Sequence, residues 1–230
     1  MRQSVSPTEK LAATLRFLAT GETLKSTNHQ TLLSSSFLCA AIPEVCRAIW
    51  KHFKDDYLKF PTTITEWKII AETFAMKWQF PHCIGALDGK HIVFQSLRKD
   101  GSYFYNYKGT NSIVLLALVD ADCRFIYIDV GCNGRTHDAG VLLQSDLKKV
   151  IDDADKYFPP DEIIGNGRKL PYVIVGDDAF PLQKHIMKPY SYNTNIKEKQ
   201  IFNIRISRAR HVVEHDFGIL ANRLKFYSIK

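Results

Sequence analysis

The stretch CIGALDGKHIVF, residues 83–94, decides the fold class of this chain. Its isoleucine, leucine, valine and phenylalanine residues are typical of a β-strand, and one carboxylate, Asp88, interrupts them. A buried carboxylate is unfavourable unless a cation, a hydrogen-bond network or solvent compensates it. An aspartate before glycine is also common in turns, so Asp88 taken alone has a structural explanation as well.

Two more stretches of strand-forming residues follow, 111–121 and 125–131. Residues 137–153 then predict a helix, residues 159–171 a loop, and PYVIVGDDAF, residues 171–180, a central strand. In this order the first strands can pair as hairpins, and the fourth arrives by a helical crossover. This is the order of RNase H-like folds. We therefore expect an α/β protein with an RNase H-like mixed sheet flanked by helices.

The last long element is a helix over residues 207–227. Its apolar residues recur at helical spacing, which predicts one buried stripe formed by Val213, Phe217, Leu220 and Leu224. Glu214 lies next to this stripe, so the helix can carry a carboxylate towards the sheet.

The predicted organisation has two parts: an N-terminal helical region over residues 1–80 and a catalytic domain over residues 81–230. In the first part, one helix ends at Gly21, and another begins at Thr63 or Thr65. Between them, the serines at 34–36 offer an N-cap for a further helix, which suits a helix-turn-helix-like unit. A plain helical bundle packed on the core fits the same pattern.

Composition excludes several classes of protein. With 230 residues, 45% of them hydrophobic, the chain can bury a sizeable core. No stretch approaches the roughly 20 apolar residues of a membrane span, and the polar N-terminus lacks the apolar core of a secretory signal. The five cysteines include no CxxC pair, so neither a disulfide framework nor a zinc ribbon is expected. We expect a soluble intracellular protein with no membrane partner.

The net charge of +7 suits a partner that carries phosphates. The net charge is +3 over residues 1–80, −1 over residues 81–160 and +5 over residues 161–230. An acidic middle between basic ends fits carboxylates that hold metal beside surfaces that hold DNA. A merely solvated basic surface explains the total equally well.

Three carboxylates stand on the predicted core elements: Asp88 in the first strand, Asp177 at the end of the fourth, and Glu214 on the last helix. Carboxylate oxygens are ligands that Mg²⁺ and Mn²⁺ prefer. Two such ions roughly 4 Å apart can activate water and stabilise the leaving oxygen of a phosphodiester. We expect these three residues to be both the catalytic residues and the metal ligands. Singly, Glu214 could instead form a surface ion pair with Arg210.

The patterns GALDGKHI, GDDAFPL and SRARHVVEHDFGIL resemble those of Harbinger (PIF-like) transposase-derived nucleases of the DDE superfamily, and the similarity covers nearly the whole chain. They carry Asp88, Asp177 and Glu214 as the DDE triad. The resemblance implies an RNase H-like fold and divalent-metal-dependent hydrolysis of DNA phosphodiesters, with two Mg²⁺ or Mn²⁺ ions. It also implies DNA and a Myb/SANT-like DNA-binding protein as partners, a homo-oligomer, and location in the nucleus, with the cytoplasm as a second compartment.

Two features depart from the family pattern. Residues 26–46 are a weak match to the family's helix-turn-helix-like segment, and the sequence stops at RLKFYSIK, before the family's usual final helix. We therefore expect a catalytic domain truncated at its C-terminus. The alternative function is that of a domesticated transposase-derived DNA-binding or scaffold protein without strand-transfer activity.

Basic residues near the predicted triad are candidates for contacts with DNA: Lys90, Lys108, Arg205, Arg208 and Arg210. Lys108 ends an aromatic stretch that begins at Tyr103. Its tyrosines could stack on bases, although their alternation favours a strand with one covered face.

His137 and Asp138 resemble the HD pair of metal phosphohydrolases. Those proteins are all-helical, whereas strands flank this pair, so Asp138 is predicted to cap the helix that follows. Asp178 could replace Asp177 as a ligand, but the family motif places the metal-binding aspartate first.

Overall fold

The computed structural model describes four stretches of the chain, residues 4–95, 101–165, 167–191 and 195–225. The chain folds as two compact units. Met1–Leu58 with Gly218–Lys230 form one unit, and Lys59–Phe217 form the other.

The boundary between the units differs from the predicted division at residue 80. Helix α4 (Ile64–Trp78) belongs to the unit that holds the sheet, because its Trp67 is fully buried there. The indole contacts Phe60 and Phe158 edge to face, with ring centroids 5.4 and 5.2 Å away. Thr63 caps the N-terminus of this helix, and it is one of the two residues predicted to do so.

In residues 4–58 of the other unit, the helices are α1 (Pro7–Thr20), α2 (Leu24–Thr31) and α3 (Ser35–Tyr57). Helix α1 ends where Gly21 adopts a left-handed conformation with φ of 64°, which glycine does without steric cost. Ser34 caps α3, as predicted. These helices enclose a small apolar core that includes Ala13, Phe17, Leu38 and Ile42.

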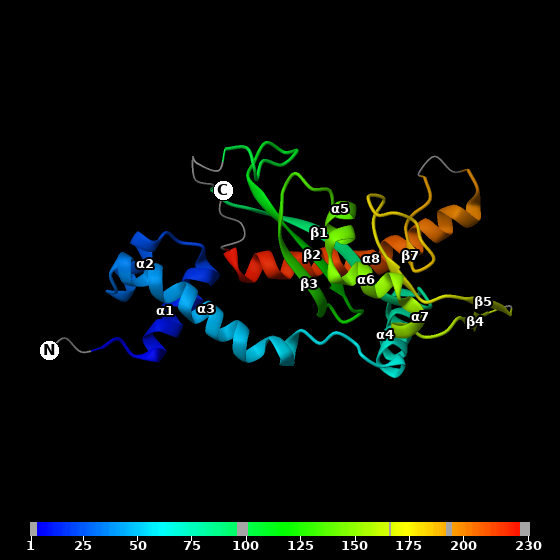
Figure 1. The fold of residues 1–230 in the computed structure, drawn as a ribbon, viewed down its shortest axis with the longest axis horizontal. Coiled ribbons are helices and arrows are strands. Elements are labelled where there is room, and N and C mark those ends of the chain that lie inside the picture. The colour runs from blue at the N-terminus through cyan, green and yellow to red at the C-terminus, as the bar shows by residue number, and fades with distance from the viewer. Residues whose placement is uncertain (1–3, 96–100, 166, 192–194, 226–230) are drawn as a thin grey trace. The chain divides into compact units, whose positions relative to one another are not determined.

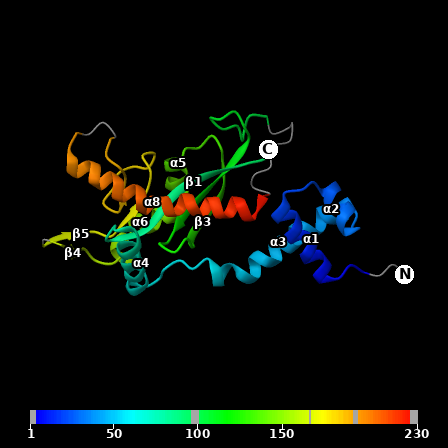
Figure 2. The same ribbon diagram turned by 180° about the vertical axis from the view of Figure 1, so that it is seen from behind.

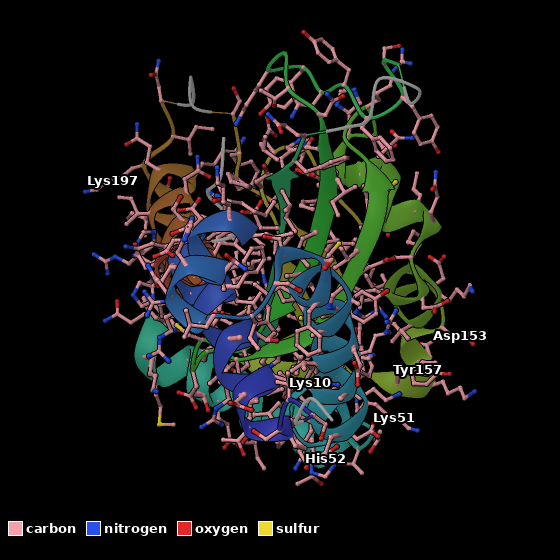
Figure 3. All side chains as sticks on the ribbon, turned by 90° about the vertical axis from the view of Figure 1, so that its left-hand side faces the viewer. Lys10, Lys51, His52, Asp153, Tyr157 and Lys197 are labelled. Carbon is pink, nitrogen blue, oxygen red and sulfur yellow. The ribbon has the colours of Figure 1, made fainter. Side chains whose placement is uncertain are left out.

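Helices α2 and α3 meet at a sharp turn. Residues 32–34 separate them, and the chain bends by 99° between the two helices, which is typical of a helix-turn-helix. Lys51 and His52 project from the surface of α3 (Figure 3). DNA recognition by this pair stays a prediction. Among the described residues, no single helix is long and apolar enough to cross a membrane, and only α2 and α3 taken together pass such a test of length and composition.

The larger unit is built on a five-stranded sheet with the strand order β3-β2-β1-β6-β7 (Figure 1). The strands are β1 (Cys83–Val93), β2 (Ser112–Val119), β3 (Phe125–Asn133), β6 (Val173–Val175) and β7 (Ile186–Met187). Strand β2 runs antiparallel to β1 and β3, whereas β6 is parallel to both β1 and β7. Three antiparallel strands followed by two parallel ones make the RNase H-like arrangement, so the predicted fold class is confirmed.

Helices cover both faces of this sheet. Helices α4, α5 (Asp138–Gln144), α6 (Asp146–Asp152) and α7 (Ala154–Tyr157) contribute to one core with the sheet. The part of α8 (Lys197–Arg223) in this unit runs along the opposite face (Figures 1 and 2). Its buried apolar residues recur at helical spacing: Ile206, Ala209, Val212, Val213 and Phe217.

The prediction of a single helix over residues 137–153 is wrong, because Ser145 divides this segment into two helices. The Ser145 hydroxyl donates to the carbonyl of Leu142 and accepts from the N–H of Lys148, which ends α5 and caps α6.

The predicted loop before β6 contains a two-stranded hairpin, β4 (Glu162–Ile164) and β5 (Arg168–Leu170). Its short strands carry charged residues and lack apolar alternation, so the sequence gives little signal for them. Helix α8 begins at Lys197 rather than at residue 207, and Leu220 and Leu224 of the predicted stripe are only partly buried.

Replacing Trp67 tests the core on which the sheet packs. Trp67→Ala is expected to lower the free energy of unfolding by about 3–5 kcal/mol, because it leaves a large cavity. Trp67→Phe keeps most of the ring volume and is expected to cost much less, since the indole Nε1 makes no hydrogen bond that would be lost. Urea unfolding followed by circular dichroism measures both, and equal losses in the two variants would contradict the packing described.

Candidate metal centre

The parallel pairing of β1 with β6 holds Asp88 and Asp177 at one edge of the sheet. Ala86 pairs with Val175 across the two strands, and each aspartate follows two residues later in its chain segment. Asp177 lies just beyond β6, and Asp88 lies within β1 just past the segment that pairs with β6, so both are at the carboxyl end of the parallel pairing, where α/β sheets place their ligands.

Asp138 joins these two aspartates. It is the first residue of α5, which begins shortly after β3 ends at Asn133. One carboxylate oxygen from each of Asp88, Asp138 and Asp177 lies within 4.8 Å of the other two, and all three residues are partly buried. Three carboxylate oxygens at this spacing can coordinate a hard divalent cation.

Gly89 allows Asp138 to come this close. A Cβ atom at position 89 would lie 2.1 Å from Oδ1 and 2.4 Å from Cγ of Asp138. Asp88 and Gly89 lie inside β1, so the interpretation of this pair as a turn is wrong. Glycine is needed here for a close approach between backbone and side chain.

The prediction that Asp138 caps α5 is also wrong. His137 occupies the N-cap position with an extended backbone, and no side chain caps the helix. As the first helical residue, Asp138 has its charge stabilised by the helix dipole. Its sequence signal was an acidic residue just after the third strand, but the sequence alone did not show that this residue reaches the edge bearing Asp88 and Asp177.

Burial raises the pKa of Asp88 to about 6. The Arg210 guanidinium opposes this rise, with Nη1 4.0 Å from Oδ2 of Asp88, while the Asp177 carboxylate adds to it. Burial, with Asp177 as a second cause, also raises the pKa of Asp138. The cluster therefore resists carrying its full negative charge, and a bound cation would relieve that repulsion.

Glu214 lies at the same pocket but outside the group of aspartates. Its carboxylate forms an ion pair with Arg210 and lies within hydrogen-bond distance, 3.1 Å, of Nδ1 of His211. Arg210 thus contacts both Glu214 and Asp88. The structure brings Asp88 and Asp177 together and connects Glu214 to them through Arg210, so the ion pair offered as the alternative role of Glu214 is present.

A pocket of about 530 Å³ surrounds the cluster. Two of the predicted DNA-contacting residues, Lys90 and Lys108, line it. Arg135 lines it too and was not singled out from the sequence. These basic side chains place positive charge around the carboxylates, as a phosphate-bearing ligand requires.

Arg205 and Arg208, both exposed on α8, are not among the residues that line this pocket. The Arg208 guanidinium donates to Oε1 of Gln79 at 3.4 Å. The structure thus separates the five predicted DNA-contacting residues. Lys90 and Lys108 line the carboxylate pocket, and Arg205 and Arg208 lie on the exposed surface of α8. The fifth, Arg210, is engaged by the carboxylates of Asp88 and Glu214.

A strand order of this kind, with acidic residues gathered where the parallel pairing of β1 with β6 ends, defines the chain as an RNase H-like protein. A family described as "DDE superfamily endonuclease" matches residues 87–229, which is more than half of the sequence. The chain belongs to that family, and the resemblance found in the sequence is confirmed.

Two curated proteins illustrate the relationship. "Protein ALP1-like" of Arabidopsis thaliana is 26% identical over 235 residues, covering 95% of this chain and 53% of that protein. "Putative nuclease HARBI1" of Rattus norvegicus is 20% identical over 223 residues, covering 97% of this chain and 60% of that protein. The chain therefore spans between half and two thirds of the length of these relatives.

One solved structure, the Mos1 transposase in a paired-end complex with the left transposon end, aligns with 99% of this chain and 82% of that chain. The sequence identity is 10% and the TM-score is 0.24, so the fold assignment rests on strand order and not on this alignment.

The raised pKa of Asp88 predicts how stability depends on pH when a chelator removes divalent ions. An unfolded aspartate has a pKa of about 3.9, whereas burial raises the pKa of Asp88 in the folded protein to about 6. Between these values only the folded state keeps the proton, so the free energy of unfolding falls as pH rises. Asp88→Asn should remove the share of this pH dependence that comes from Asp88. In the presence of a chelator at pH 7, it should raise the free energy of unfolding by on the order of 1–3 kcal/mol.

Urea unfolding of both proteins in a chelator at several pH values between about 4 and 7 measures the effect. Burial also raises the pKa of Asp216 to about 6, but that group titrates in both proteins and cancels in the difference. Parallel pH profiles for wild type and Asp88→Asn would contradict the assigned environment of Asp88.

Proposed function

We propose that this chain is a divalent-metal-dependent DNA endonuclease that hydrolyses phosphodiesters in the manner of a transposase. The observation that carries the proposal is the convergence of Asp88, Asp138 and Asp177 within 4.8 Å, in a pocket lined by basic side chains. Membership of the DDE superfamily endonuclease family supports it.

The donor set fits Mg²⁺ or Mn²⁺. The three clustered groups are carboxylates, which these ions prefer, and no thiol or imidazole belongs to this group of described residues. Asp88 and Asp177 would be the central ligands, with Asp138 beside them. Glu214 would help to hold a second ion once its carboxylate turns away from Arg210. When bound, two such ions activate the attacking water and stabilise the leaving oxygen.

The chain's own residues position the substrate in this proposal. Lys90, Lys108 and Arg135 would hold phosphates on either side of the scissile bond, because their charges line the pocket that contains the carboxylates. Arg210 keeps Glu214 and Asp88 partly neutralised before the metal binds. Arg205 and Arg208 would extend the contact with the DNA backbone along α8.

The second candidate is a DNA-binding or scaffold protein without strand transfer. The contacts of Glu214 with Arg210 and His211 favour it, because they leave only the aspartates in ligand geometry. Location in the nucleus, a Myb/SANT-like partner and a homo-oligomer are further parts of the proposal, and they rest on the family resemblance alone.

Nicking of supercoiled plasmid separates the two candidates. With Mg²⁺ or Mn²⁺ the wild type should nick, and Asp88→Ala or Asp177→Asn should lower the rate by at least about 100-fold, because each removes a metal ligand. Asp178→Asn is the matched control, since Asp178 points to Lys188 at 3.1 Å and lies outside the cluster. Wild type that binds the plasmid but never nicks it would favour the second candidate.

The salt dependence of DNA binding tests the surface of α8. In Arg205→Gln/Arg208→Gln, affinity should fall about equally for all sequences. The slope of log K against log salt should flatten by about one unit per lost phosphate contact, about two in total. Arg168→Gln/Lys169→Gln on the β4–β5 hairpin removes the same charge elsewhere and serves as control. If both double variants keep the wild-type slope, α8 does not contact the DNA backbone.

A further inference from the structure

Three tyrosines before β2 lie on a turn and not on a strand. Tyr103, Tyr105 and Tyr107 belong to the segment between β1 and β2, and they are 60%, 51% and 76% exposed. The sequence favoured an interpretation in which these tyrosines cover one face of a strand, and that interpretation is wrong. Tyr107 is the most exposed of the three and is the one that lines the carboxylate pocket.

The turn is fastened to the strands that carry the centre. Asn106 is buried, and its Oδ1 accepts hydrogen bonds from the N–H groups of Lys108 and Thr110. Its Nδ2 donates to Oγ of Ser112 at 2.8 Å, and that Oγ lies 2.9 Å from Nδ1 of His91. Because Ser112 belongs to β2 and His91 to β1, the turn is tied to both strands and held in one place.

Tyr107 differs from the other two tyrosines because it lines the pocket that contains Asp88 and Asp177. Its ring meets His91 edge to face, with centroids 5.6 Å apart and planes at 71°. The ammonium group of Lys108 lies 5.3 Å from the centre of the ring. An aromatic ring and a cationic side chain therefore lie next to each other in the pocket that holds the carboxylates.

We propose that Tyr107 and Lys108 form a binding site for an unpaired nucleobase and its phosphate beside the scissile bond. An aromatic ring stacks on the face of a base, and a lysine binds the adjoining phosphate. In a duplex, neighbouring bases cover both faces, so Tyr107 can stack only on a base that has left the helix. The favoured substrate is therefore DNA with an unpaired nucleotide at the cleavage site. This inference rests on the proposed function in taking DNA as the ligand.

The probe is a short duplex with a single bulged 2-aminopurine, compared with the same duplex carrying an abasic bulge. Binding is measured by anisotropy of a distant dye, in a chelator so that no cleavage occurs. Wild type should bind the base-bearing bulge about tenfold more tightly than the abasic one and quench 2-aminopurine emission. Tyr107→Ala should bind both probes equally without quenching, whereas Tyr107→Phe should keep both effects because it keeps the ring.

Tyr103→Ala is the matched control, since Tyr103 is a similarly exposed tyrosine of the same turn but is not among the residues that line the pocket. It should keep the preference for the base. The inference is overturned if wild type shows no preference, or if Tyr107→Ala retains it. The nicking assay reports separately on the proposed function: nicking without base preference would remove only the inference, and base preference without nicking would remove only the nuclease.

Discussion

The parallel pairing of β1 with β6 is the constraint on which the rest of the site depends. It is the only pairing in the described sheet that joins the antiparallel half to the parallel half, and it sets Ala86 opposite Val175. Asp88 and Asp177 each follow this pair by two residues, so they have to lie close together. Like charges in a partly buried place destabilise the fold unless something opposes them. The groups around the two aspartates affect this repulsion between their charges.

Arg210 and Gly89 both contact the carboxylates of this site. Arg210 approaches Asp88 and pairs with Glu214, so one cation serves carboxylates on two elements. Gly89 provides its N–H to Asp88 and leaves space for Asp138, which adds a third negative charge. A further carboxylate increases the repulsion, so it lowers the stability of the fold when no cation is bound. The third carboxylate is favourable if a divalent cation occupies the centre, because its two positive charges then neutralise the carboxylates that Arg210 neutralises only in part.

The sequence predicts the fold well because the core strands are apolar, branched and clearly bounded. Asp88 and Asp177 were found because each interrupts or ends such a strand. Asp138 was assigned to a cap instead, because its role depends on where α5 begins relative to β1, and that geometry has no local signal. The break at Ser145 and the short β4–β5 hairpin were missed for a related reason: each depends on a few hydrogen bonds and not on a repeating apolar pattern. Glu214 lies on the predicted helix, yet only the structure shows its pairing with Arg210 and His211.

In the proposed site, Asp88, Asp138 and Asp177 gather around a divalent cation. Anomalous diffraction from crystals grown with Mn²⁺ locates such an ion directly. We expect a peak roughly 2–2.6 Å from an oxygen of each of these three aspartates, a range typical of hard cations bound by carboxylates. Crystals that diffract well and show Mn²⁺ only elsewhere, with Arg210 still against Asp88, would contradict it.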